Sequence, residues 1–89
     1  MLYIWDEAKR AANLAKHGVD FAAAECFDWE TARVSADLRR AYGEPRMVAL
    51  GKIGSRLHVM VFTRRAGKVR IISLRKANNR EMWRYEEFA

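Results

Sequence analysis

Two hydrophobic patterns divide the chain, a helical one near the N-terminus and an alternating one in the second half. Residues 2–5 are apolar and aromatic, which predicts a short strand. Residues 7–16 are rich in Ala, Leu and Lys, and their alanines recur at helical spacing, which predicts a helix with a narrow packing face. Asp6 is placed to cap the start of this helix, and Gly18 is placed to end it in the left-handed conformation.

Further elements are predicted from Asp20 onward. This residue is placed to cap a second helix that runs to about residue 27. Alternation of apolar and polar residues, clearest in 56–65, then predicts four strands. They are expected over residues 30–36, 46–52, 56–65 and 69–74. The middle of 56–65 is apolar on both faces, so we expect it to be a central strand.

Turn signals separate these strands, and a capping signal follows them. A charged segment over 37–44 predicts a loop, and Ile53-Gly54-Ser55 and Ala66-Gly67 predict hairpin turns. Asn78 and Glu81 have the spacing of a capping box, which predicts a final helix that carries Trp83, Tyr85 and Phe88.

The order of elements is β-α-α-β-β-β-β-α, which predicts an α+β fold with an antiparallel β-sheet. We expect two N-terminal helices on one face and a C-terminal helix. Residues 1–89 are too few for two independent cores, so a single domain is expected. The sequence shows neither a secretory signal nor the roughly 20 apolar residues of a membrane span. The one cysteine, Cys26, excludes an intramolecular disulfide and predicts a buried structural role in a reducing, cytoplasmic setting.

Charge is unevenly distributed along the chain. The formal net charge is +6, but residues 1–44 hold six basic and eight acidic residues, whereas residues 45–89 hold eleven basic and three acidic ones. Between Pro45 and Arg80 there are ten Lys or Arg residues and no Asp or Glu. A positive field of this kind favours a polyanionic partner, and nucleic acid is the first candidate.

Three arginines of the basic half lie on the last predicted hairpin. Arg64 ends one strand, and Arg70 and Arg75 lie on the strand that pairs with it. We expect the turn at 66–67 to bring Arg64 and Arg70 close together, with no acid nearby. The planar guanidinium binds two phosphate oxygens at once, so this cluster predicts a phosphate site; the alternative is a solvated basic face.

Several other residues are candidates for proton transfer, each with a structural alternative. Lys76 is a base if its pKa is lowered, and otherwise attracts phosphate. His17 is either a functional group or a residue that interacts with helix carbonyls at a C-terminus. Tyr85, like Trp83, either stacks on a base or anchors the last helix. His58 is either a proton-transfer group or a half-buried sheet residue. Further contacts to RNA are predicted for Arg56, Arg65, Lys68 and Arg80.

Two acidic residues near the N-terminus have alternative roles, and the chain holds few metal-ligating side chains. Asp6 and Glu7 are either capping residues or a carboxylate base. One Cys, two distant His and no carboxylate cluster among the basic strands predict no metal site, and no motif predicts a cofactor.

Three segments together resemble one known family. They are Trp5-Asp6-Glu7 with Lys9, Asn13, Lys16-His17-Gly18-Val19, Phe21 and Ala24; then Leu50-Gly51; then Arg70-Ile71-Ile72-Ser73-Leu74-Arg75-Lys76-Ala77 with Glu81 and Tyr85. In order and spacing the chain resembles the BrnT family of type II toxin–antitoxin toxins. Leu74 departs from the family, which more often has a small residue there. Strand alternation places Leu74 opposite Ser73 and Arg75, so we expect a packing adjustment only.

The resemblance implies a fold and a function. It implies a RelE-like fold and a cytoplasmic endoribonuclease that cleaves RNA without metal, by attack of the 2′-hydroxyl on the phosphodiester. Arg64, Arg70 and Arg75 would hold the phosphate, with His17, Lys76 or Tyr85 for proton transfer. It also implies a ribbon-helix-helix antitoxin in a 2:2 complex that binds operator DNA. Two alternatives remain open at this point: a non-catalytic nucleic-acid-binding or regulatory module, and an interaction protein for an acidic partner.

Overall fold

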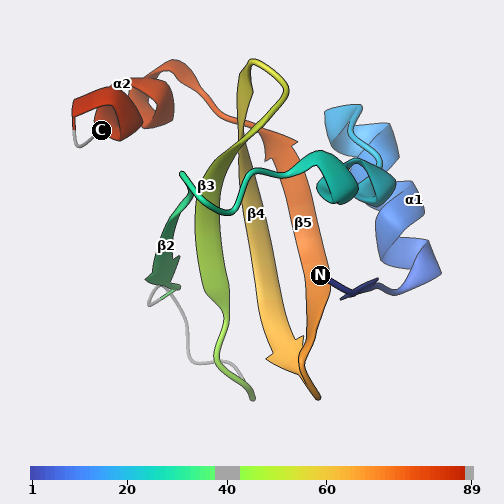
Figure 1. Ribbon diagram of the computed structural model, residues 1–89. Helices are drawn as coiled ribbons and strands as arrows, with labels where there is room; N and C mark the ends of the chain where they lie inside the picture. The colour runs from blue at the N-terminus through green and yellow to red at the C-terminus, as the bar shows by residue number, and fades with distance from the viewer. Residues whose placement is uncertain (38–42, 88–89) are drawn as a thin grey trace.

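A five-stranded sheet forms the centre of the molecule, with helical segments on both of its faces (Figure 1). The computed structural model describes residues 1–37 and 43–87. The strands, in the spatial order β1-β5-β4-β3-β2, are Tyr3–Ile4 (β1), Arg33–Ala36 (β2), Met47–Ile53 (β3), Arg56–Arg65 (β4) and Lys68–Lys76 (β5). The helical segments are Glu7–His17 (α1), Phe21–Cys26 (η1) and Asn79–Glu87 (α2).

Strands β2 to β5 form an antiparallel meander, and β4 lies in its middle as its apolar faces predicted. The expectation of a wholly antiparallel sheet is wrong at one edge. Strand β1 pairs in parallel with β5, through Tyr3 with Val69 and Ile4 with Arg70. The architecture is therefore α+β with a mostly antiparallel sheet.

The first helix has the predicted capping residues. The Asp6 carboxylate accepts a hydrogen bond from the Lys9 backbone N–H at 3.0 Å, which satisfies one of the unpaired donors of the first turn. Gly18 has φ 72° and its N–H donates to Leu14 O at 2.8 Å. This left-handed conformation is the one that glycine adopts without steric cost.

The second predicted helix is a 3₁₀ segment, η1, rather than an α-helix. Asp20 caps it as expected, by accepting from the Ala22 N–H at 3.0 Å. Phe21 and Ala24 are fully buried, and their spacing of three residues matches the three-residue turn of a 3₁₀-helix. The segment thus keeps its apolar side on the sheet throughout its length.

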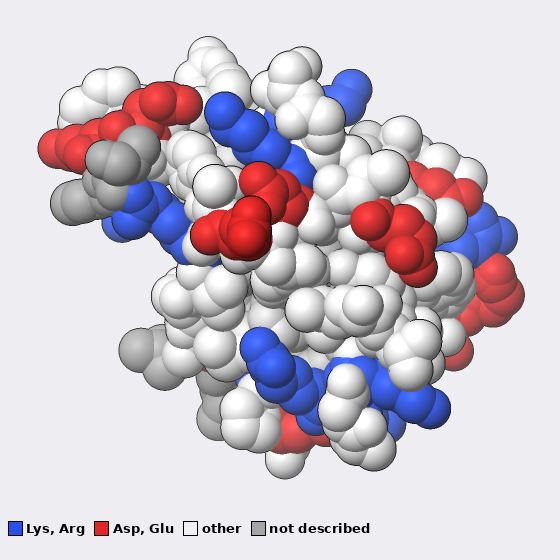
Figure 2. Space-filling model, in the orientation of Figure 1, with Lys and Arg blue, Asp and Glu red and all other residues white. Residues whose placement is uncertain are grey.

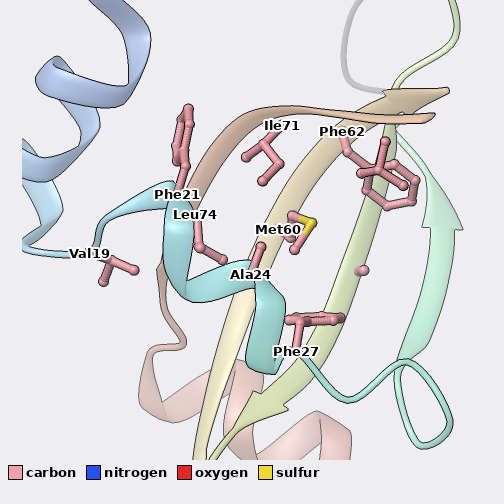
Figure 3. Packing of buried hydrophobic residues seen from close by; sticks show 10 residues of the cluster. Val19, Phe21, Ala24, Phe27, Met60, Phe62, Ile71 and Leu74 are labelled. Atoms are coloured by element: carbon pink, nitrogen blue, oxygen red, sulfur yellow. The ribbon is translucent and has the colours of Figure 1, made fainter. Parts of the chain in front are cut away.

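The main core lies between η1 and the sheet (Figure 3). Phe21, Ala24 and Phe27 pack against side chains of the central strands, which include Met60, Phe62, Ile71 and Leu74. The Phe27 ring lies directly over Gly51, and a Cβ at that position would overlap the ring. The bare glycine therefore allows the aromatic layer to approach the sheet closely.

A smaller core lies on the opposite face, under α2. It consists of Leu57, Val59, Ala77 and Tyr85. The predicted capping box is confirmed, because Asn78 Oδ1 accepts from the Glu81 N–H at 2.8 Å and Glu81 Oε1 accepts from the Asn78 N–H at 2.9 Å. We call this second side of the sheet, opposite η1, the open face.

Three remaining expectations concern the exposure of Cys26, the predicted loop over 37–44 and the possibility of a membrane span. Cys26 is exposed, so the prediction of a buried cysteine is wrong: it ends η1 on the solvent side. Most of the predicted loop over 37–44, and Phe88, lie outside the described residues. Within the described ranges no helix is long and apolar enough to cross a membrane.

Candidate functional site

The strand register determines which side chains share the open face, because directly paired residues project to the same side of a sheet. One row across the strands holds Arg33, Leu50, Val59 and Arg75. The next row holds Ser35, Val48, Val61 and Ser73. A depression of about 330 Å³ lies over these rows and is also bordered by Glu81 of α2. We call it the open-face pocket.

A bidentate ion pair forms one wall of this pocket. The two terminal nitrogens of Arg75 donate to the two carboxylate oxygens of Glu81, at 2.8 and 2.7 Å. This hydrogen bonding holds the pKa of Glu81 below its ordinary value, so the carboxylate stays ionised. Because Glu81 also caps α2, the ion pair fixes the Arg75 guanidinium relative to both the strand and the helix.

A second pocket lies on the other side of β5, between this strand and α1. Its volume is about 300 Å³, and it is lined by Lys9, Ala12, Asn13, Lys16, His17, Ile72 and Ser73. We call it the edge pocket. Ser73 borders both pockets, so they meet at this residue.

His17 brings a titratable group to that junction. Its imidazole is partly buried at the end of α1. Burial lowers its pKa below the ordinary value of 6.5, and the positive charges of Lys16 and Arg75 lower it further. Arg75 therefore lies within electrostatic reach of His17. At neutral pH the imidazole is held in its neutral form, which can accept a proton.

We call this junction the β5 site. It comprises His17, Ser73, Arg75 and Glu81, with Lys16 beside them. A neutral imidazole accepts protons, a guanidinium stabilises negative charge on a phosphate, and a hydroxyl supplies a hydrogen bond. These are the functions that cleavage of a phosphodiester requires.

The predicted cluster of Arg64 with Arg70 does not form. Arg64 pairs with Val69, whereas Arg70 pairs with Thr63, so the two arginines project to opposite faces of the hairpin. The Arg64 guanidinium lies 6.0 Å from the centre of the Phe62 ring, on the η1 side. Arg70 lies on the open face with Arg75, separated from it by the row of Ser73.

The expectation of arginines without acids nearby is also wrong. Arg75 pairs with Glu81, and Arg65 donates to the carboxylate of Glu44 at 2.7 and 3.2 Å. This hydrogen bonding lowers the pKa of Glu44, with smaller contributions from Arg65, Arg70 and Arg46 as charges. Strand pairing brings Glu44 beside the basic hairpin, 21 residues away in sequence.

The two other proton-transfer candidates differ in position: Lys76 projects away from the β5 site, whereas Tyr85 lines a further pocket on the open face beside Glu81. Lys76 is exposed and pairs with His58, so it projects from the face opposite Arg75. Tyr85 is 7% exposed, and its hydroxyl donates to Thr31 O at 2.9 Å. Its contacts are those of a residue that anchors α2 to the sheet.

The remaining predicted residues occupy several surfaces. Arg56 donates to Ala77 O at 2.8 Å, next to the start of α2, and Lys68 and Arg80 are exposed. Figure 2 shows the η1 side of the molecule, where Lys and Arg stand in separate groups with acidic side chains between them. The positive charges therefore do not form one continuous patch on this side.

Three further candidate residues, Asp6, Glu7 and His58, have contacts of a structural kind. Asp6 caps α1, and Glu7 pairs with Arg10 at 2.6 Å. His58 is 6% exposed within β4, and its Nδ1 lies 2.8 Å from Arg56 O. In residues 1–37 and 43–87, no three His, Cys, Asp or Glu side chains gather as metal ligands.

Sequence reasoning did not assign a role in the site to Ser73, Glu81, Lys16 or Asn13. Glu81 was recognised as a capping residue, and its position six residues after Arg75 gave no sign of an ion pair. All four residues belong to the segments that carry the family resemblance, which was the available signal.

Comparison with known proteins defines the class of this chain. A family model described as "Ribonuclease toxin, BrnT, of type II toxin-antitoxin system" matches residues 5–81. This range includes His17, Ser73, Arg75 and Glu81 and most of the fold. No curated protein matches the chain. The protein is therefore a ribonuclease toxin of a type II toxin–antitoxin system.

The chain belongs to the BrnT toxin family. Its substrate is accordingly RNA, and a cognate antitoxin is implied. The two alternatives without ribonuclease activity, a regulatory module and an interaction protein, do not agree with this family.

Proposed function

We propose that this toxin cleaves RNA at the β5 site by attack of a ribose 2′-oxygen on the adjacent phosphorus, without a metal ion. The new bond joins the 2′-oxygen to phosphorus, and the bond from phosphorus to the 5′-oxygen breaks. The products are a 2′,3′-cyclic phosphate and a 5′-hydroxyl. The proton of the 2′-hydroxyl passes to the neutral imidazole of His17, and the leaving oxygen takes a proton from water.

The observation that supports this proposal best is that His17 and Arg75 line two pockets that share Ser73, with Arg75 near enough for its charge to lower the pKa of His17. A scissile phosphate at Ser73 would have the imidazole on the α1 side and the guanidinium on the open-face side. Arg75 would stabilise the negative charge that develops on the phosphate oxygens. Glu81 would hold the guanidinium in one orientation, which lowers the cost of organising the site.

The other predicted residues receive different roles in this proposal. Arg70 shares the open face with Arg75 and is assigned to a neighbouring phosphate of the RNA. Arg64 and Lys76 project to the opposite face and are assigned to general attraction of the polyanion, together with Arg56, Arg65, Lys68 and Arg80. Tyr85 is assigned to anchoring α2.

The antitoxin is proposed to be a ribbon-helix-helix protein, as the family resemblance implies. An acidic or amphipathic segment of it would cover the β5 site and neutralise the basic half of the toxin in the same contact. The same proposal includes a 2:2 complex that binds operator DNA. It also includes a RelE-like topology and action in the cytoplasm.

The test is cleavage of a labelled RNA by the purified toxin, with and without EDTA. We expect cyclic phosphate ends and unchanged rates with EDTA. His17→Gln and Arg75→Ala should lose cleavage while remaining folded, and Arg64→Ala, on the opposite face of the same hairpin, is the matched control that should retain kcat even if KM rises. Loss of activity in EDTA, 5′-phosphate products, or full activity of His17→Gln would overturn the mechanism.

A further inference from the structure

Asn13 is a buried amide that the proposed chemistry does not use. It is 7% exposed on α1. Its Nδ2 donates to Leu74 O at 2.7 Å and to Val19 O at 3.0 Å, and its Oδ1 accepts from the Leu74 N–H at 3.2 Å. An amide side chain offers the same donor and acceptor as a backbone peptide. Asn13 therefore pairs with Leu74 as a residue of a neighbouring strand would.

The edge of β5 needs such a partner at this point. Strand β1 pairs with β5 at Val69 and Arg70, and within residues 1–37 and 43–87 no strand pairs with the later part of β5 on that side. Peptide groups at a covered sheet edge must still find hydrogen-bond partners. Asn13 supplies the donor and the acceptor for the peptide groups of Leu74. These two hydrogen bonds connect α1 to β5 between Ser73 and Arg75.

The same amide fixes the chain on both sides of His17. Residues four apart lie on the same face of a helix, so His17 follows Asn13 along the face that meets β5. After His17 the helix ends at Gly18, and the next carbonyl, that of Val19, accepts from the Asn13 amide. His17 therefore lies between Asn13 and Val19 in the sequence. The Asn13 side chain hydrogen-bonds both to Val19 and to Leu74 of the strand.

We propose that Asn13 is the positioning residue that holds His17 against Ser73 and Arg75. This inference rests on the proposed function of the β5 site. Without the amide, the peptide groups of Leu74 and the carbonyl of Val19 lose their partners, and the last turn of α1 separates from β5. Cleavage then falls because the base is misplaced, although no group that touches RNA has been removed.

The first measurement is an NMR titration of His17 in the wild type and in Asn13→Ala, with the resonance assigned by its loss in His17→Gln. The groups that face the imidazole are Lys9 and Lys16 on α1 and Arg75 on β5. In Asn13→Ala we expect the pKa of His17 to rise toward 6.5, because burial and the charge of Arg75 both diminish. Ile71→Val, in the core under η1, is the control variant that lowers stability and should leave this titration unchanged.

The second measurement is RNA cleavage. Asn13→Ala should lower kcat roughly 10- to 100-fold and retain KM, because misplacement of a reacting group by about 1 Å has effects of this order. Asn13→Gln keeps the amide but lengthens the side chain by one methylene, so it preserves folding if the alanine variant does not fold. It should shift the His17 titration and lower kcat in the same direction.

The outcomes separate the two proposals. An unchanged His17 titration in both Asn13 variants would refute the positioning role, even if His17→Gln is inactive. Full activity of His17→Gln would instead refute the proposed base, whatever the titration shows in the Asn13 variants.

Discussion

The ion pair between Arg75 and Glu81 gives a quantitative prediction for stability. Glu81 takes part in two structures at once, the bidentate pair with Arg75 and the capping box with Asn78. Glu81→Gln removes the charge but retains a side chain that can complete a capping box. Glu81→Ala removes both. Comparing the two variants separates the contribution of the ion pair from that of the cap.

The expected magnitude follows from the geometry and exposure of the pair. The side chains of Arg75 and Glu81 are 34% and 23% exposed, so water screens the pair in part. Hydrogen bonds to charged groups contribute about 1.5–3 kcal/mol when well buried, and we expect about 1–2 kcal/mol for Glu81→Gln. Loss of the cap adds about 0.5–1 kcal/mol in Glu81→Ala. For a domain of this size, each kcal/mol corresponds to about 4–8 °C in Tm.

The assay is urea or thermal unfolding as a function of pH, with Glu86→Gln as the control on the exposed side of the same helix. The folded-state pKa of Glu81 is lowered from 4.5, so its stabilisation is present above pH 4.5 and is lost as the pH falls through the folded-state pKa. The difference between the wild type and Glu81→Gln should therefore shrink in acid. Equal stability of Glu81→Gln and Glu86→Gln at pH 7 would refute the assigned contribution.

Three further predictions follow from other contacts. Gly51→Ala should destabilise the fold by about 1–3 kcal/mol because its methyl overlaps the ring above it; denaturant unfolding measures this, and Gly43→Ala, with open space around it, is the control. Trp29→Phe should cost about 1 kcal/mol through loss of the 2.7 Å hydrogen bond from its Nε1 to the Tyr3 hydroxyl, measured as a lower Tm. The cleavage rate should rise with pH with a midpoint below pH 6.5, measured as a pH–rate profile, because the pKa of His17 is lowered and its neutral form is the proposed base.

Much of the fold could be predicted because its signals are local. The caps at Asp6, Asp20 and Gly18 and the capping box at Asn78 are short-range patterns, and each is present as predicted. The parallel pairing of β1 could not be predicted, because a two-residue strand carries no information about its partner. The 3₁₀ form of η1 was missed because apolar residues three apart fit both types of helix.

The candidate site was harder to predict because it depends on register. Arg64 and Arg70 flank the same turn but do not pair with each other. Arg64 pairs with Val69 and Arg70 pairs with Thr63, and this offset of one residue places the two arginines on opposite faces. His17 and Arg75 were both named from the sequence, yet nothing local places them together. The hydrogen bonds between Asn13 and Leu74 do so, across 61 residues of sequence.

The basic residues of 45–89 have two proposed roles, attraction of RNA and chemistry at the β5 site, and these roles fall on different parts of the structure. A meander alternates its side chains between two faces, so consecutive residues such as Arg64 and Arg65 project to opposite sides of the sheet. Part of the charge is also offset locally, by Glu44 at Arg65 and by Glu81 at Arg75. What remains is a diffuse positive field, which attracts RNA over a distance and weakens with salt. In the proposed mechanism, chemistry at the β5 site depends instead on short contacts beside a partly buried imidazole, which salt screens much less. On this proposal, raising the salt concentration should weaken RNA binding by the toxin more than it slows cleavage of RNA that is already bound.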